Sequence, residues 1–150
     1  MTTEELFERH QVIALDSNVL TYLLECRGPL AEAAGEIVDG IESGAAAVVP
    51  ASVALTEIVT RPATLGEVEV FERCADELGS IPHMRVVALD AEMAVDAAWG
   101  RSGGRDLGDA IHIATARRSG ATCCVTNDRH VRGRCGVVIV PLAASEIALR

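Results

Sequence analysis

Short apolar runs alternate with longer segments of helical periodicity along the whole chain. Continuous apolar runs predict strands at residues 12–16, 46–49, 85–89, 122–125 and 137–140. Apolar residues at helical spacing predict helices at residues 18–26, 29–44, 51–60, 66–78, 91–100, 106–119 and 143–149. Continuous apolar strands between helices are typical of a parallel sheet that is covered on both faces. The pattern therefore predicts an α/β/α sandwich with about five central strands, folded as one domain over residues 1–150.

Proline and glycine define two of the expected helix ends. The helix at 51–60 should stop before Pro62, because a proline inside a helix removes one backbone hydrogen bond. The helix at 106–119 should end at Gly120, since glycine readily takes the left-handed conformation that terminates many helices. In such folds polar chemistry collects beyond the carboxyl ends of the strands, so residues that follow strands are the first candidates for a site.

The composition predicts an aliphatic core and no membrane segment. Hydrophobic residues make up 49% of the 150 residues but aromatic residues only 3%, so Ala, Val, Leu and Ile must fill the core. No apolar run reaches the ~18–20 residues that a membrane-spanning helix needs. Residues 1–10 are acidic and lack the basic-then-apolar order of a signal peptide. We therefore expect a soluble, cytoplasmic protein.

The chain has five cysteines, which are Cys26, Cys74, Cys123, Cys124 and Cys135. The number is odd, and no two of them form a C-x-x-C pair. Buried, reduced thiols are therefore expected rather than a disulfide framework or a zinc site. Cys123 and Cys124 are adjacent in an apolar run, so on a strand their side chains would point to opposite faces of the sheet.

Charge is distributed unevenly along the chain. The net charge is −9, but residues 1–100 carry 5 Arg against 18 acidic residues, whereas residues 101–134 carry 7 Arg against 3 Asp. The basic segment could contact phosphates, or its arginines could simply be solvated. Its best candidates for phosphate contacts, taken as a group, are Arg101, Arg105, Arg129, Arg132 and Arg134. All 13 basic residues are arginine, which excludes a P-loop NTPase and a Schiff-base enzyme because both need a lysine.

Two aspartates follow predicted strands. Asp16 ends the first strand, and Asp128 follows the fourth. Either could simply cap a helix, because an Asp between a strand and a helix commonly accepts backbone N–H groups. Ser17 and Asn18 could cap equally well, which weakens that explanation for Asp16.

Two further acids lie within predicted helices. Asp109 is in the first turn of its helix, where it could form a capping box with Asp106 as the N-cap. Glu57 lies in an apolar helix that should pack on the sheet, where a carboxylate needs a cation, a metal or access to solvent. Glu57 could also lie on the exposed stripe of that helix.

Together the four acids indicate a metal site. Four carboxylates around one end of a sheet would repel one another unless a cation joined them. Oxygen ligands without a set of Cys or His ligands suit Mg²⁺ or Mn²⁺ rather than Zn²⁺. Such a site retains open positions for water and a phosphate oxygen, as metal-assisted phosphodiester hydrolysis requires.

The arrangement of these acids resembles the PIN domain family over residues 12 to about 140. The resemblance is carried by four motifs: Asp16-Ser17-Asn18 after a strand, Glu57 in the third helix, Asp109-Ala110-Ile111-His112-Ile113-Ala114-Thr115-Ala116, and Thr126-Asn127-Asp128. A solitary PIN domain of this length is most similar to the VapC toxins of bacterial type II toxin–antitoxin pairs.

The resemblance implies a parallel sheet of order 3-2-1-4-5 and a Mg²⁺- or Mn²⁺-dependent endoribonuclease. It also implies a homodimer, an RNA substrate and a small antitoxin partner. The implied catalytic and metal-binding residues are Asp16, Glu57, Asp109 and Asp128. The residues implied to support them by hydrogen bonds are Ser17, Asn18 and Thr126.

Three other residues near these motifs have simpler explanations. His112 could face the site as a ligand or base, but such a histidine is more often a satisfied helix residue. Asp106 could be an outer ligand, although its position favours an N-cap. Trp99 should pack in the core rather than stack on a base.

There are three alternative functions, two with the PIN fold and one with a different fold. A PIN nuclease could act in RNA processing without a toxin role, or a catalytically idle PIN fold could serve only as a binding protein. A haloacid-dehalogenase-like phosphatase that starts from Asp16 is disfavoured. It needs a second Asp where Asn18 stands, and it needs a lysine, which this chain lacks.

Overall fold

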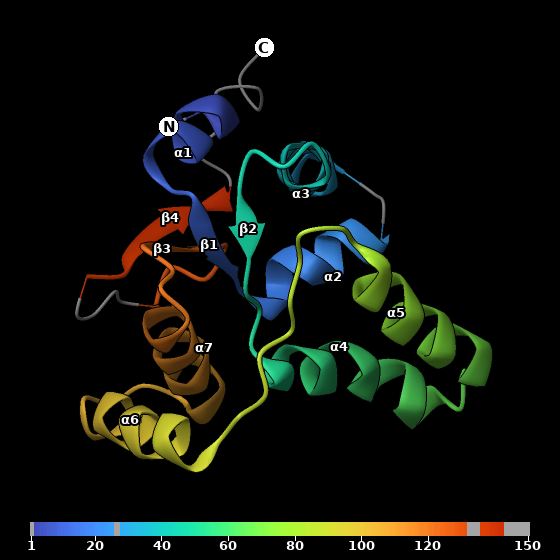
Figure 1. Ribbon diagram of the computed structural model, residues 1–150. Coiled ribbons are helices and arrows are strands. Elements are labelled where there is room, and N and C mark those ends of the chain that lie inside the picture. The colour runs from blue at the N-terminus through green and yellow to red at the C-terminus, as the bar shows by residue number, and fades with distance from the viewer. Residues whose placement is uncertain (1, 26–27, 132–135, 143–150) are drawn as a thin grey trace.

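A parallel four-stranded sheet forms the centre of the computed structural model, which describes residues 2–25, 28–131 and 136–142 (Figure 1). The strands are β1 (Val12–Leu15), β2 (Ala47–Val48), β3 (Cys123–Thr126) and β4 (Val138–Pro141), in the order β2-β1-β3-β4. The helices are α1 (Thr3–Arg9), α2 (Ser17–Glu25), α3 (Pro29–Glu42), α4 (Ser52–Leu65), α5 (Val68–Ser80), α6 (Ala91–Ser102) and α7 (Leu107–Arg118). The expected α/β fold is confirmed, and the expected closing helix at 143–149 lies outside the described residues.

The expected strand at 85–89 forms only two isolated parallel bridges beside β2. The Arg85 N–H donates to the Val48 carbonyl at 2.8 Å, and the Val87 N–H donates to the Pro50 carbonyl at 2.9 Å. A continuous ladder would also need an N–H from Pro50 to the Arg85 carbonyl, and proline has none. The expected order 3-2-1-4-5 is therefore kept, with its outermost strand reduced to two bridges.

Two helices differ from the sequence prediction. The prediction that the third helix stops before Pro62 is wrong, because α4 continues through that buried proline and ends at Gly66, whose φ of 71° is left-handed. The packing of the proline ring offsets the one backbone hydrogen bond that it removes. Helix α1 was not predicted, although Thr2 and Glu5 form a reciprocal capping box at its start.

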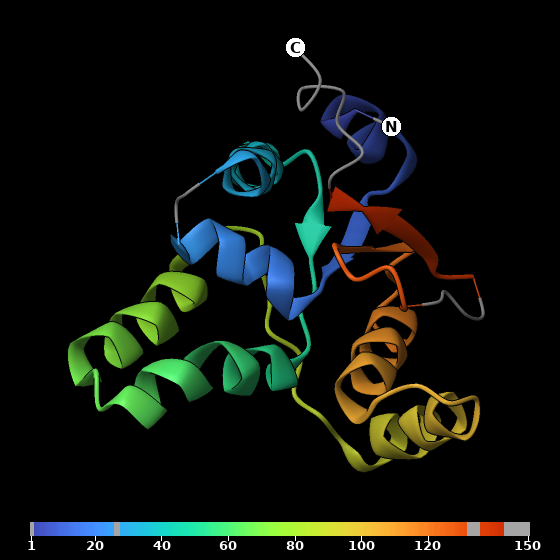
Figure 2. The same cartoon turned by 180° about the vertical axis from the view of Figure 1, so that it is seen from behind.

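Helices cover both faces of the sheet (Figures 1 and 2). One core cluster combines apolar residues of β1 and β3 with those of α2, α3, α4 and α5. A second cluster on the opposite face joins the sheet to α6 and α7. Alternate residues of a strand point to opposite faces, so Cys123 lies in the first cluster and Cys124 in the second. None of the described helices is long and apolar enough to cross a membrane.

The cysteines that the structure describes are buried free thiols, as expected: Cys74, Cys123 and Cys124. Burial raises the pKa of the Cys123 thiol to about 12 and raises the pKa of the Cys124 thiol further. Both thiols therefore stay protonated at neutral pH and fill the core as small apolar groups. Cys26 and Cys135 lie outside the described residues.

Candidate metal centre

The carboxylate of Asp16 lies at the carboxyl end of β1, and only 6% of the residue is exposed. Strands β1 and β3 are parallel neighbours with Leu15 beside Val125, so the residues that follow them also meet. The Thr126 hydroxyl donates to Oδ2 of Asp16 at 2.5 Å, and the Asn18 amide donates to the same oxygen at 2.9 Å. The backbone N–H of residue 17 donates to Oδ1 at 2.7 Å. These charge-assisted bonds fix the orientation of a buried carboxylate.

The turn after β3 places Asp128 next to this group. The Asp128 N–H donates to the Thr126 hydroxyl at 2.9 Å, and its Oδ1 accepts the His130 N–H at 2.7 Å. Asn18 also binds this turn, because its side-chain oxygen accepts the Asn127 N–H at 3.1 Å. The simpler explanation was that Asp128 caps a helix. In the structure its carboxylate instead holds a turn, through the N–H of His130.

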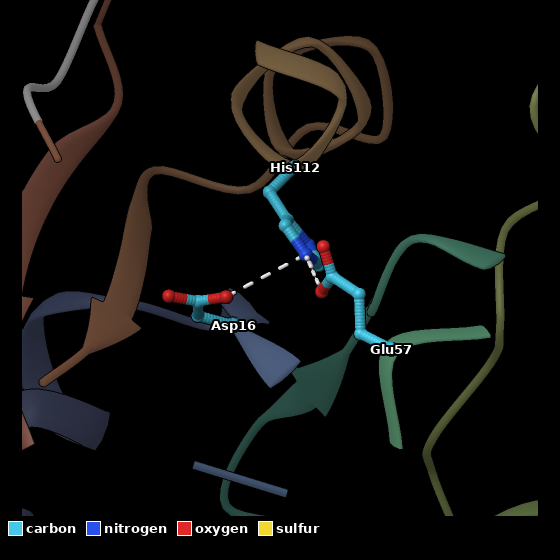
Figure 3. A group of neighbouring side chains, drawn as sticks. All are labelled: Asp16, Glu57 and His112. Atoms are coloured by element: carbon cyan, nitrogen blue, oxygen red, sulfur yellow. Dashed lines mark hydrogen bonds and ion pairs between the residues drawn. The ribbon is translucent and has the colours of Figure 1, made fainter. Parts of the chain in front are cut away.

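The side chains of Glu57 from α4 and His112 from α7 also point toward the Asp16 carboxylate (Figure 3). His112 Nε2 lies 3.1 Å from Oε2 of Glu57 and 3.5 Å from Oδ1 of Asp16. One ligand atom from each of these three residues lies within 4.8 Å of the other two. Three separate elements thus converge on a single point at the carboxyl edge of the sheet.

His112 is almost fully enclosed, with 4% of its surface exposed. Burial by itself lowers the pKa of the imidazole, but the Glu57 hydrogen bond and the charges of Asp16, Glu57 and Asp109 outweigh burial and raise the pKa. The His112 hydrogen bond in turn lowers the pKa of Glu57 against the effect of desolvation, with a smaller contribution from Ser17. A buried imidazole and a half-exposed carboxylate therefore hold each other in place.

Asp109 lies in the first turn of α7, after Asp106. The Asp106 carboxylate accepts the Asp109 N–H at 3.2 Å, which makes it the N-cap expected from the sequence. Desolvation raises the pKa of Asp109, and the negative charges of Asp106, Asp16 and Asp128 raise it further. Asp109 is thus close enough to the other acids for their charges to act on it.

The four acids predicted from the sequence lie in one region, but only two of them belong to the closely spaced group of three residues. Asp16 and Glu57 belong to this group. The charge of Asp109 acts on His112 of this group, whereas Asp128 is linked to Asp16 through the Thr126 hydroxyl. His112 is the third member of this group. The sequence pattern favours a purely structural role for it in its helix. The one signal for its place in the group was its spacing of three from Asp109, which puts both side chains near one face of the helix.

A family model for the PIN domain matches residues 13–135 and so covers most of the chain. The chain belongs to the PIN domain family. The matched segment includes every member of the acidic group and both strands that position it.

Solved structures with the same fold come from toxin–antitoxin systems. They include VapBC2 from Rickettsia felis bound to a promoter DNA fragment, with a TM-score of 0.68 and 12% identity over 87% of this chain and 98% of that chain. A toxin–antitoxin complex from Klebsiella pneumoniae has a TM-score of 0.63 and 19% identity over 84% and 95%. VapC20 from Mycobacterium tuberculosis, a sarcin-ricin loop cleaving toxin, has a TM-score of 0.64 and 16% identity over 79% of this chain and 92% of that chain. Identities this low show a shared fold, and no curated protein matches the sequence.

The centre of this PIN domain fits the divalent cation that nucleases of the family generally use. Carboxylate oxygens and an imidazole nitrogen are hard and borderline donors that bind first-row divalent ions. Burial and the like charges of neighbouring aspartates both raise the pKa of Asp109, and a bound cation would offset that repulsion.

The arginines of the basic segment divide into two groups. Arg117 and Arg118 of α7 form ion pairs with Asp96 and Glu92 of α6, so they tie these two helices together. Of the arginines proposed for RNA, Arg101 and Arg129 are exposed and Arg105 is partly buried, while Arg132 and Arg134 lie outside the described residues.

The expectation that Trp99 packs in the core is wrong, because 64% of it is exposed. With Arg105 and Arg117 it lines a hollow of about 350 Å³ between α6 and α7. Trp99 lies near the end of α6, and the face that this helix buries is formed instead by Met93, Ala97 and Gly100. The hollow borders the face of α7 that carries Ala110 and Ala114, not the face that carries His112.

Gly108 controls how closely Glu57 approaches α7, because a Cβ at this position would overlap Oε1 of Glu57. We expect Gly108→Ala to displace the carboxylate and to weaken Mn²⁺ binding by about tenfold. Stability should hold or rise by about 0.5 kcal/mol, since alanine favours helix over glycine. Calorimetric titration with Mn²⁺ and thermal melts measure the two effects.

The matched control for this substitution is Gly79→Ala in α5, where an added Cβ meets nothing within 4 Å. It should show the same helix effect with unchanged Mn²⁺ affinity. If Gly108→Ala binds Mn²⁺ as tightly as the control, Glu57 does not need the space that this glycine provides.

Replacement of Asp109 by Asn should raise the melting temperature of the metal-free protein by about 1–3 °C at pH 7, after allowance for solvent screening. A raised folded-state pKa means that the ionised carboxylate destabilises the fold. The penalty is complete above the folded pKa and disappears as the pH falls below the unfolded one. Melts in EDTA at pH 7 and pH 3 measure the difference. A lower melting temperature for Asp109→Asn at pH 7, with no change for exposed Asp39→Asn, would contradict this destabilisation.

Proposed function

We propose that this PIN domain is a Mg²⁺- or Mn²⁺-dependent endoribonuclease and the toxin of a toxin–antitoxin pair. The observation that supports it best is the convergence of Asp16, Glu57 and His112 within 4.8 Å, beside the charge of Asp109 and Asp128. A scaffold that only bound a partner would have no need to hold this much like charge together.

The four acids that we propose as catalytic and metal-binding residues are Asp16, Glu57, Asp109 and Asp128. When bound, the cation polarises the scissile phosphate and makes water a stronger nucleophile. Thr126, Asn18 and Ser17 keep the Asp16 oxygens in a fixed direction, so a bound ion would meet a ligand that needs no reorganisation. Glu57 is partly exposed and can adjust as substrate arrives.

The reaction that suits this centre is in-line hydrolysis of an RNA phosphodiester. A water oxygen forms a bond to phosphorus as the bond from phosphorus to the 3′-oxygen breaks. The leaving oxygen takes a proton to become a 3′-hydroxyl, and the phosphate stays on the 5′ side of the next nucleotide. Exposed single-stranded loops are the accessible targets in structured RNA.

The substrate backbone is proposed to bind the basic segment. Arg101 lies in the last turn of α6, Arg105 precedes the N-cap of α7, and Arg129 follows Asp128 directly, so these arginines flank two of the four acids in the chain. Arg117 and Arg118 are engaged with α6 and are not needed for this role.

The proposed antitoxin has a groove available beside the centre. Residues of α2, α4 and α5 line a depression of about 440 Å³ that reaches Glu57 and includes apolar Leu24, Ile58 and Val70. An amphipathic tail could bury apolar side chains in this groove and direct a basic one toward the acids. The homodimer remains part of the proposal on the family resemblance alone.

Purified protein should cleave structured RNA in Mg²⁺ or Mn²⁺ and lose that activity in EDTA. The products should carry 5′-phosphate and 3′-hydroxyl ends, detected by ligation and by mass. Asp16→Asn should lower cleavage by at least about a hundredfold, because it removes the central charge. Full activity in EDTA, or 2′,3′-cyclic phosphate ends, would exclude hydrolysis by this mechanism.

The basic segment is tested by the salt dependence of RNA binding, measured with Asp16→Asn to prevent cleavage. Replacing Arg129, Arg132 and Arg134 by Ala should lower the slope of log affinity against log salt by about 2, or roughly 0.7 per lost contact. The control replaces three arginines of the acidic part of the chain: Arg61, Arg73 and Arg85. An equal change of slope in both variants would place the RNA elsewhere.

The toxin role is tested by expression in a bacterial host. Wild type should arrest growth within a few doublings, while Asp16→Asn should not, because growth arrest requires RNA cleavage. Co-expression of the protein encoded beside this gene should restore growth if that protein is the antitoxin. Normal growth with active, soluble wild type would favour the RNA-processing alternative.

A further inference from the structure

We propose that Nε2 of His112 is itself a ligand of the cation, so that the centre is a mixed carboxylate–imidazole site that prefers Mn²⁺ over Mg²⁺. This inference rests on the proposed function, because it concerns the cation of the same centre. The acidic pattern in the sequence suggests oxygen ligands alone, and the nitrogen comes from the folded structure.

The distances around His112 match a shared ion. Two ligand atoms that each lie about 2.1 Å from one ion are about 3.0 Å apart at 90° and about 3.4 Å apart at the tetrahedral angle. Nε2 lies 3.1 Å from a Glu57 oxygen and 3.5 Å from an Asp16 oxygen. Figure 3 shows the imidazole directed between the two carboxylates, so its tip borders the space that an ion between them would occupy.

The fold holds the imidazole at this position. His112 lies in a stretch of α7 whose residues are all buried from Ala110 to Ala116, and α7 contacts both α6 and the sheet. The ring has 4% exposure and cannot turn out into solvent without unpacking the helix. A cation between Asp16 and Glu57 would therefore meet Nε2. To bind it, Nε2 would release the hydrogen that it donates to Glu57, and the neutral ring would keep its one hydrogen on Nδ1.

An imidazole ligand changes which ion the centre selects. Imidazole nitrogen suits transition-metal ions, whereas Mg²⁺ prefers oxygen ligands and water. We expect wild type to bind Mn²⁺ at least about tenfold more tightly than Mg²⁺. His112→Asn should lose about tenfold or more of its Mn²⁺ affinity and much less of its Mg²⁺ affinity. If His112 served only to orient Glu57 by a hydrogen bond, the affinities for both ions would fall together.

Pulsed electron paramagnetic resonance of the protein with one equivalent of Mn²⁺ tests the contact directly. Wild type should show electron-spin-echo modulation from a ¹⁴N nucleus, and labelling of histidine with ¹⁵N should change its frequencies. The modulation should disappear in His112→Asn. It should persist in His130→Asn, whose backbone N–H binds Asp128, and in His10→Asn, whose ring contacts Thr122.

Each outcome decides the proposal. If wild type binds Mn²⁺ without nitrogen modulation, or if the modulation persists in His112→Asn, His112 is not a ligand; metal-dependent cleavage, measured separately, would still stand. If wild type binds no Mn²⁺, both this inference and the metal-dependent function fail. The wild-type and ¹⁵N measurements do not depend on whether His112→Asn folds.

Discussion

The buried charge of Asp16 is the constraint around which this end of the molecule is organised. A carboxylate that is 6% exposed would cost several kcal/mol without donors or a cation. Parallel pairing of β1 with β3 supplies Thr126, and the first turn of α2 supplies Asn18 and the N–H of residue 17. Strand order, helix start and turn geometry are therefore all used to satisfy one side chain.

The other side chains of the centre come from α4 and α7. Here the constraint is that several acids lie close together, rather than that one charge is buried. Burial and the charges of the neighbouring aspartates raise the pKa of Asp109, and Gly108 lets Glu57 come close to the start of α7. His112 is the one imidazole among these acids in the described residues, and against the effect of burial the Glu57 hydrogen bond and the charges of the acids raise its pKa. A cation bound at this centre would offset the repulsion between these acids and so stabilise the fold.

The sequence was most informative where one physical rule decides the structure. Continuous apolar runs located the strands, and acids at the ends of two of those strands located the centre. Pro50 shows the limit of that pattern, because the missing N–H of one residue reduced an expected strand to two bridges. Pro62 shows another limit, since burial of its ring allowed α4 to continue. His112 could not be placed because α7 is buried on all sides through its middle, and the spacing of three from Asp109 was the one sign of which way the histidine points.

The most direct test of the central claim is the position of a bound ion. A crystal grown with Mn²⁺ and measured with anomalous scattering should show one strong peak about 2.2 Å from carboxylate oxygens of Asp16 and Glu57, at the carboxyl end of β1. Such a peak would establish the centre as a cation site held by the elements described above. A well-ordered centre with no peak at saturating Mn²⁺, or a peak bound only by surface carboxylates elsewhere, would contradict the account.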